Sequence, residues 1–206
     1  MNQQRYLVNG KPIDIYFKVD RFIHEVLERK EYGFLFHDLV VLDVGCNIGT
    51  WTFSIYDHIK QAYALDVSQE CIDIMNQTIA KNQLTKVKTF CLGLAAESGK
   101  RNVQVDDEPG LGGWHFTTSD HPSIGVDVID IKSLMDNEKI EYIDVMKIDV
   151  EGAEHEIFES QAFRDVAHRI NTIVGEFHSR DPGEVLTKAG FYYQPLWSHF
   201  IAKRNK

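Results

Sequence analysis

The chain has 206 residues, of which 43% are hydrophobic and 26% are charged. These fractions are ordinary for a globular domain, so collagen-like, low-complexity and disordered classes are excluded. The 22 basic and 31 acidic residues give a net charge of −9. Broad binding to nucleic-acid phosphates is therefore not expected, because it needs clustered lysine and arginine. The length predicts a single domain over residues 1–206.

The three cysteines, Cys46, Cys71 and Cys91, are odd in number and widely spaced. This pattern fits neither a disulfide framework nor a CxxC metal or redox site. A reducing compartment, the cytoplasm, is the simpler expectation. Residues 1–10 have no apolar signal-peptide core, and the chain has no run of about 18 apolar residues. We therefore expect neither a secretory signal nor a membrane span.

The N-terminal region, residues 1–37, is predicted to precede the core. Its Asn9-Gly10 pair lies between two β-rich segments, which is typical of a β-hairpin. Asp20 then predicts the start of an amphipathic helix that ends near Gly33. The core is expected to cover residues 38–206.

From residue 38 onward, short apolar runs alternate with stretches of helical periodicity. This alternation is typical of an α/β fold in which helices cover both faces of a largely parallel sheet. Ligands bind such sheets outside the carboxyl ends of the strands, where the strand order reverses. Strands are predicted over residues 40–44, 62–66, 87–92, 143–148, 172–177, 191–193 and 199–202.

Three of the predicted helices have clear local patterns. One helical stretch carries Trp51, Ile55 and Ile59 on one face. Another begins after Ser68, a residue type that caps helix N-termini. A third begins in the segment 181–184, Asp-Pro-Gly-Glu. There we expect the aspartate as the cap, the proline at the first helical position and the glutamate completing a capping box.

The first core strand leads into a glycine-containing turn, Asp43-Val44-Gly45-Cys46-Asn47-Ile48-Gly49-Thr50. Such a turn brings a ligand close to the backbone and to a helix N-terminus. A dinucleotide fingerprint beginning at Gly45 would need glycines where Asn47 and Thr50 stand, and a Walker loop would need a lysine. The remaining pattern is D-x-G-x-x-x-G with a carboxylate at the strand end.

That carboxylate, Asp43, would repel a pyrophosphate but suits a ligand that carries positive charge. S-adenosylmethionine carries a sulfonium and an α-ammonium group, so Asp43 can serve that end of it. Asp66 ends the second core strand, where a carboxylate can accept two hydrogen bonds from ribose hydroxyls. The loop together with Asp66 favours an adenosyl ligand over a plain tight turn.

A second group of polar side chains follows the fourth and fifth core strands. If these strands are neighbours, about 4.8 Å apart, the side chains crowd one crevice. Carboxylates in such a cluster raise one another's pKa, which is typical of functional sites. For two members, Glu154 and His155, the plainer interpretation is a solvated acidic rim at a helix N-terminus. The group comprises Asp149, Glu151, Glu154, His155, Glu176 and His178.

Three uses of this group remain open. Asp149 can hold the methionine ammonium. Glu151, Glu176 or His178 can accept a proton from a nucleophile, and His178 is the first choice. Several of them together can bind a divalent metal such as Mg²⁺ that grips a substrate oxygen. Lys147, inside an apolar strand, is expected to be buried and paired with a neighbouring carboxylate.

Segments 43–49, 146–154 and 175–178 resemble the FkbM family of S-adenosylmethionine-dependent methyltransferases, and the string K-I-D-V-E-G-A-E is the most specific part. The resemblance covers roughly residues 38–204. It implies a class I methyltransferase fold, a Rossmann-like three-layer α/β sandwich. Its mostly parallel seven-stranded sheet would have an antiparallel last strand. The resemblance also implies methyl transfer to a hydroxyl of a sugar or other small molecule.

The chain departs from the family pattern at three places. Asp66 stands where a glutamate is usual, and Cys46 stands where alanine is frequent. The segment Glu108–Ser123 does not match the family pattern. We interpret it as a lid or acceptor-binding loop, with Trp114 and His115 as candidate acceptor-binding residues, or else as a surface turn.

The expected site residues follow from these motifs and the resemblance. Catalytic roles are expected for His178, Asp149, Glu151 and Glu176. Cofactor contacts are expected from Asp43, Gly45, Asn47, Gly49, Thr50, Asp66, Val67, Leu94, Ala95 and Asp149.

Three alternatives come from other classes. The glycine spacing disfavours a nicotinamide-dependent oxidoreductase. A non-catalytic cofactor-binding module and a metal-dependent methyltransferase remain open. The fourth strand is not followed by the Asn/Asp-Pro-Pro-aromatic motif of enzymes that methylate amino groups of nucleic-acid bases. We therefore expect a small-molecule or sugar acceptor, with no nucleic-acid or membrane partner; the acceptor's identity and the oligomeric state stay open.

Overall fold

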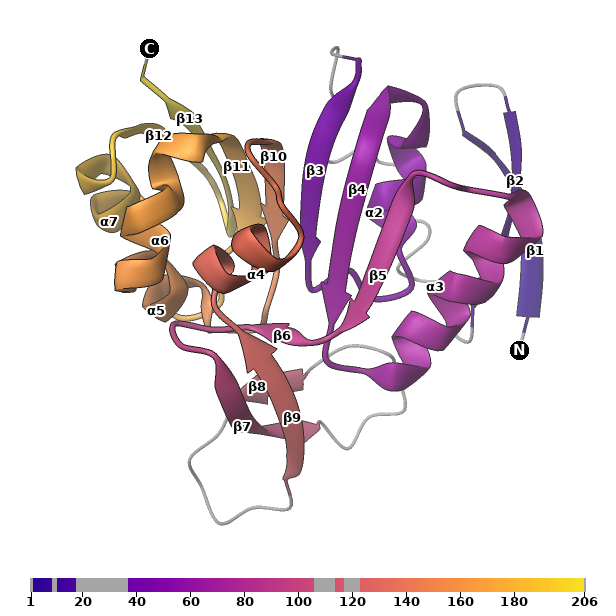
Figure 1. Ribbon diagram of the computed structural model, residues 1–206, viewed down its shortest axis with the longest axis horizontal. Coiled ribbons are helices and arrows are strands. Elements are labelled where there is room, and N and C mark those ends of the chain that lie inside the picture. Colours follow the sequence, from indigo (N-terminus) through magenta and orange to yellow (C-terminus); the bar gives the residue numbers. More distant parts are fainter. Residues whose placement is uncertain (1, 9–10, 18–36, 106–113, 117–122, 206) are drawn as a thin grey trace.

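The computed structural model describes residues 2–8, 11–17, 37–105, 114–116 and 123–205. A seven-stranded sheet forms its centre, in the order β12-β13-β11-β10-β3-β4-β5 (Figure 1). In chain order its strands are β3 (Leu39–Val44), β4 (Ile59–Asp66), β5 (Val87–Cys91), β10 (Ile143–Ile148), β11 (Ile170–Glu176), β12 (Phe191–Leu196) and β13 (His199–Arg204).

The strand directions confirm the predicted topology. β3, β4, β5, β10 and β11 pair in parallel, whereas β13 runs antiparallel to both β11 and β12. The chain proceeds outward from β3 through β4 to β5 and then returns to β10 on the other side of β3. The strand order therefore reverses between β3 and β10, and a ligand site is expected outside their carboxyl ends.

Helices cover both faces of this sheet and make the fold a three-layer sandwich, as predicted (Figure 1). One face is covered by α2 (Thr50–Ser54) and α3 (Gln69–Asn82). The other is covered by α4 (Ile131–Asn137), α5 (Glu154–Glu159), α6 (Gln161–Val166) and α7 (Gly183–Lys188). Short 3-10 turns, η2 (Tyr56–His58) and η3 (Ala167–Arg169), precede β4 and β11.

Burial on both faces explains the apolar runs in the central strands. Leu42 and Met146 pack against the α4–α7 layer, and Val41 packs against α2; all three are fully buried. Strands covered on both sides have no solvent face that would favour alternating polar residues. Among the described residues, no helix is long and apolar enough to cross a membrane.

Of the predicted helix boundaries, some are confirmed and others are wrong. Ser68 caps α3 as predicted, because its side chain accepts a hydrogen bond from the Cys71 N–H. The prediction that Ile59 continues a helix is wrong: α2 ends at Ser54, and Ile59 begins β4, fully buried and paired with Leu39. Strand pairing and burial at this position override the helical spacing.

The predicted capping box before α7 is also wrong. Asp181 accepts a hydrogen bond of 2.7 Å from the Gly183 N–H, but Pro182 occupies the cap position and α7 begins at Gly183. Glu184 pairs with Lys188 one turn later, at 2.6 Å, instead of reaching back to the cap.

The predicted N-terminal hairpin is present and packs against α3. β1 (Asn2–Val8) and β2 (Lys11–Phe17) pair antiparallel. Ile15 is fully buried, and the Asn82 side chain of α3 exchanges two hydrogen bonds with the backbone of Asp14, 2.9 and 2.8 Å long. The helix predicted after Asp20 lies outside the described residues.

A second, four-stranded sheet was not predicted. It has the order β6-β9-β7-β8 and lies below the arrowheads of β4 and β5 in Figure 1, at the carboxyl end of the main sheet. Part of the segment interpreted as a lid or turn is therefore a strand, β8. The side chains of the candidate acceptor-binding residues Trp114 and His115 lie outside the described part of the structure. The strands are β6 (Gly93–Leu94), β7 (Gly99–Val105), β8 (Trp114–Phe116) and β9 (Ile124–Ile129).

Candidate active site

The glycine-containing turn after β3 is held tightly between two strands. The N–H groups of Gly45 and Cys46 both donate to the Leu65 carbonyl of β4, at 2.9 Å. Gly45 has a φ of +71°, and a Cβ placed there would lie 1.8 Å from the carbonyl oxygen of Asp149. Only glycine fits this approach of the turn to the end of β10. Gly49, with a φ of +83°, precedes α2 and packs against Met75.

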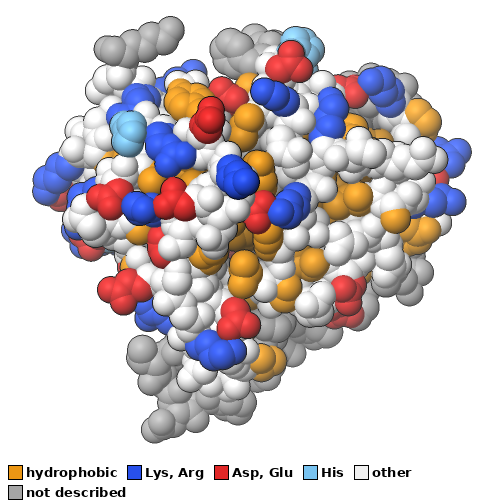
Figure 2. Space-filling view, viewed as in Figure 1, with side chains coloured by type: hydrophobic (Ala, Val, Ile, Leu, Met, Phe, Trp, Pro, Cys, Tyr) orange, Lys and Arg blue, Asp and Glu red, His pale blue; other side chains and the backbone are white. Residues whose placement is uncertain are grey.

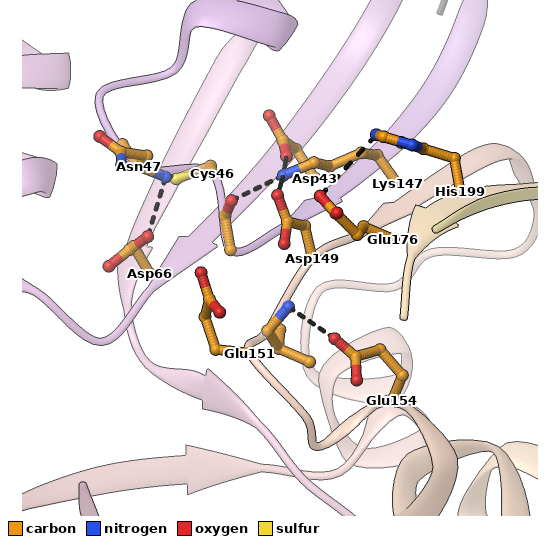
Figure 3. A network of polar contacts seen from close by, with 12 residues as sticks. Asp43, Cys46, Asn47, Asp66, Lys147, Asp149, Glu151, Glu154, Glu176 and His199 are labelled. Carbon is orange, nitrogen blue, oxygen red and sulfur yellow. Dashed lines mark hydrogen bonds and ion pairs between the residues drawn. The ribbon is translucent and has the colours of Figure 1, made fainter. Parts of the chain in front are cut away.

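Asp66, at the end of β4, organises this turn. One carboxylate oxygen accepts a hydrogen bond from the Asn47 N–H (Figure 3) and the other accepts one from the Ser68 N–H, both at 2.8 Å. Burial raises the pKa of Asp66, against the opposing effect of these two N–H groups. The side chain is only half-buried, and a carboxylate has about four lone-pair sites. Asp66 therefore keeps acceptor capacity for a ligand.

A buried lysine connects the ends of β3 and β10. The Lys147 ammonium donates to the Gly45 carbonyl at 2.8 Å and lies 3.5 Å from Asp149 and 3.7 Å from Asp43 (Figure 3). Burial alone would lower the pKa of Lys147, but the carboxylates of Asp149 and Asp43 outweigh it and raise that pKa. Lys147 is therefore a cation at neutral pH, paired as the sequence indicates.

Asp43 lies beneath the turn, with no exposed surface. The Thr52 hydroxyl donates to one of its oxygens at 2.6 Å, and the other oxygen faces Lys147 without a hydrogen bond from any described residue. Burial raises the pKa of Asp43, and Lys147 opposes this. The structure thus places Asp43 as a support of the turn.

His178 follows β11 and is surrounded by carboxylates. Its Nδ1 lies 3.1 Å from Glu154 Oε1, while its Nε2 lies 3.3 Å from Glu151 and 3.8 Å from Asp149. The hydrogen bond to Glu154 and the charges of these three groups outweigh partial burial and raise the pKa of His178 to about 9. The imidazole is therefore protonated at neutral pH and has no lone pair to accept a proton.

Glu151 and Glu154 differ sharply in their surroundings. Glu154 has 1% of its side chain exposed, and its Oε1 also accepts hydrogen bonds from the N–H groups of Val150 and Gly152 (3.2 and 3.3 Å), so it is a structural anchor. Glu151 has 40% of its side chain exposed and a left-handed φ of +53°. Burial raises the pKa of Glu151, against the attraction of His178.

Glu176 has a partner that the sequence did not predict. Its carboxylate lies 3.7 Å from the His199 Nε2, because the two residues face each other across β11 and β13 (Figure 3). The sequence reasoning missed His199. The signal that would find it is the antiparallel register of the last strand, which cannot be read before the turn of that hairpin is known.

The remaining expected residues lie around the same edge. Thr50 and Leu94 are buried, and Ala95 packs with Val67 in a small cluster under the second sheet. His155 points to its own helix and lies 3.3 Å from Glu159.

Three side chains of the site have the geometry of a metal site. One ligand atom each of Asp149, Glu151 and His178 lies within 4.8 Å of the others. Carboxylates with an imidazole suit divalent ions such as Mn²⁺, and carboxylate oxygens alone suit Mg²⁺.

The FkbM methyltransferase domain matches residues 43–199, a range that includes the glycine turn, the acidic cluster and β12. The chain belongs to the FkbM methyltransferase family. No curated protein matches the chain at a significant level. Membership of this family confirms the resemblance seen in the sequence and makes this edge of the sheet the candidate active site of a methyltransferase.

Solved structures of methyltransferases share the fold. A precorrin-6y C5,15-methyltransferase from Geobacter metallireducens GS-15 is 12% identical with a TM-score of 0.53, and the match covers 92% of this chain and 90% of that one. An rRNA methylase from Streptococcus thermophilus is 14% identical with a TM-score of 0.50, covering 93% and 99%. M. capricolum TrmK, solved with S-adenosylhomocysteine, is 13% identical with a TM-score of 0.50, covering 92% and 70%. Identities this low show the class I fold alone.

The charge on His178 predicts a pH dependence of stability. Its pKa is about 9 in the folded protein and about 6.5 in an unfolded chain. The protonated imidazole therefore stabilises the fold fully below about pH 6.5, and this contribution is lost as the pH rises through about 9. In urea unfolding of cofactor-free protein in EDTA, His178→Asn should remove that part of the pH dependence. The exposed His168→Asn is the matched control, and equal pH profiles of both variants would contradict the assignment.

Proposed function

We propose that this protein is an S-adenosylmethionine-dependent methyltransferase that methylates a hydroxyl group of a small molecule or sugar. The observation that carries the proposal is the meeting of two groups at the point where the strand order reverses. The glycine turn with Asp66 lies on one side of this point, and the cluster of Asp149, Glu151 and His178 lies on the other. Family membership supplies the reaction class.

The residues at the end of β3 and β4 fit the adenosyl donor. The backbone of Gly45 can be approached closely, and the half-buried Asp66 keeps lone pairs for ribose hydroxyls. The Asp149 side chain is 35% exposed and can accept hydrogen bonds from the α-ammonium of the methionine part. The S-adenosylhomocysteine bound in the TrmK structure supports this cofactor. When bound, S-adenosylmethionine supplies an electrophilic methyl group on its sulfonium.

Glu151 is the proposed acceptor of the hydroxyl proton. It is accessible, its pKa is raised by burial, and a base works best with a pKa near the working pH. His178 lies 3.3 Å from it and is itself fixed by the buried Glu154. His178 is thus proposed to orient Glu151 and Asp149, and not to act as the base. Alignment of the reacting groups is proposed to supply the larger part of the lowering of the activation barrier, up to about 7–11 kcal/mol in good cases.

The surface favours a small acceptor over a nucleic acid. The printed names of structural neighbours include methylases of rRNA and tRNA, but those likenesses concern the fold. On the face seen in Figure 2, lysine and arginine side chains are interspersed with acidic ones. With a net charge of −9, such a surface gives little attraction to a phosphate backbone.

The ribose role of Asp66 is tested by cofactor affinity. Asp66→Ala should weaken S-adenosylhomocysteine binding about tenfold or more, because each hydrogen bond to a charged group contributes about 1.5–3 kcal/mol. Isothermal titration calorimetry measures this, with Asp127→Ala, an exposed carboxylate of β9 that pairs with Lys100, as the control. Unchanged affinity in Asp66→Ala would refute the role.

The base role of Glu151 is tested by turnover. Glu151→Gln should lower kcat about 10²–10⁴-fold, the usual contribution of a general base, while S-adenosylhomocysteine affinity stays the same. Turnover is measured as thioether release with an acceptor found by screening hydroxylated sugars and metabolites. Glu156→Gln is the control, because Glu156 lies on α5, just after the turn that carries Glu151, and its side chain is 45% exposed. A kcat within threefold, roughly, of the wild type would exclude Glu151 as the base.

The second candidate is a metal-dependent O-methyltransferase, favoured by the proximity of Asp149, Glu151 and His178. A divalent ion held there would lower the pKa of the acceptor hydroxyl and replace the proton of His178. This candidate predicts that turnover falls in EDTA and returns with Mg²⁺ or Mn²⁺, and that Asp149→Asn abolishes binding of the ion by calorimetry. Full turnover in EDTA would exclude it.

A further inference from the structure

The turn between β12 and β13 presents one tryptophan entirely to solvent. The strands are joined by two residues, Trp197 and Ser198, because Leu196 and His199 form the last pair of the ladder. Trp197 is 97% exposed, far above the other exposed large hydrophobic residues of the described chain, the next being Tyr192 at 65%. Burying an indole removes a large apolar surface from water and so stabilises a fold. The exposed Trp197 therefore contributes none of this stabilisation in the isolated chain.

The backbone at Trp197 is also unfavourable for its side chain. The φ of Trp197 is +64°, whereas the φ of Ser198 is not positive. A two-residue hairpin turn with positive φ at its first position only has the type II′ pattern, and that position favours glycine. A bulky residue with positive φ is an outlier, and such outliers gather at functional sites, where the local rule is overridden.

This turn is joined directly to the candidate active site. The Ser198 carbonyl accepts a 2.9 Å hydrogen bond from the Phe177 N–H, and His199 lies 3.7 Å from Glu176. Phe177 is the residue before His178. Trp197 is therefore held at the carboxyl edge of the sheet, beyond β11, on the side opposite to β4 and Asp66.

We propose that Trp197 binds the methyl acceptor by stacking its indole on a flat ring face of that molecule. The acceptor class is a hydroxylated ring compound, whose C–H or aromatic face contacts the indole while its hydroxyls reach Glu176. The inference rests on the proposed function, since it places the donor at β3 and β4 and the acceptor toward β11. An indole offers a rigid apolar face with only two side-chain torsions to fix, which suits this use.

The test uses p-nitrophenyl β-D-glucopyranoside, which joins a hydroxylated ring to an aromatic ring, as the probe. Calorimetry measures its affinity for the full chain saturated with S-adenosylhomocysteine. Trp197→Gly should weaken probe binding about fivefold or more, the lower range for loss of one stacking aromatic, whereas Trp197→Phe should stay within about twofold. Tyr192→Ser is the matched control, because Tyr192 is exposed on the same hairpin but lies opposite Lys203, away from the turn.

Folding failure is separated from loss of contact by the same variants. Glycine suits a type II′ turn, so Trp197→Gly should raise the melting temperature and leave S-adenosylhomocysteine affinity unchanged. If the probe binds equally to the wild type and Trp197→Gly, or binds to neither, the role of Trp197 is overturned while the proposed function stands. Absence of S-adenosylhomocysteine binding to the wild type overturns the proposed function and this inference with it. Binding to phosphatidylcholine vesicles that is lost in Trp197→Gly overturns it in favour of a membrane contact.

Discussion

A single buried ammonium, that of Lys147, holds the candidate active site together. It lies between the carboxylates of Asp43 and Asp149 and donates to the carbonyl of Gly45, so it joins β3, the glycine turn and the end of β10. An unpaired buried charge costs several kcal/mol, whereas a paired one is tolerated. These groups therefore depend on one another. Because Gly45 touches the backbone of Asp149 at a distance that excludes any side chain, a shift of the turn would move the acidic cluster with it.

These contacts fix the two halves of the site relative to each other, although the residues in each half differ. On the β4 side, Asp66 uses two backbone N–H groups to shape the turn. On the β11 side, Glu154 is almost fully buried and anchors both the turn after β10 and the imidazole of His178. In each half a buried or half-buried carboxylate fixes the backbone, and the more exposed Asp149 and Glu151 both lie in the half that contains His178.

The sequence predicted the central sheet because its strands are covered on both faces and so appear as unbroken apolar runs. The second sheet was missed because β6 has two residues and β8 three, too few for a periodic pattern, and because β9 pairs with strands distant in the chain. Ile59 was misplaced since its partner in β3 decides its conformation. The motifs located Asp66, Asp149 and His178, but only the fold shows that His178 has three acidic neighbours.

The balance of charges around His178 determines which kind of ligand, cationic or anionic, this edge of the sheet favours. Asp149, Glu151 and Glu154 surround one protonated imidazole, and Asp149 shares Lys147 with Asp43. More carboxylates than cations meet here, so the edge favours a further positive charge. An ammonium and sulfonium donor satisfies this, and so does a divalent ion. A nicotinamide dinucleotide does not, because its pyrophosphate would add negative charge near Asp149 and the other carboxylates of this edge. The same electrostatics that raise the pKa of His178 thus agree with the family in the kind of cofactor they select.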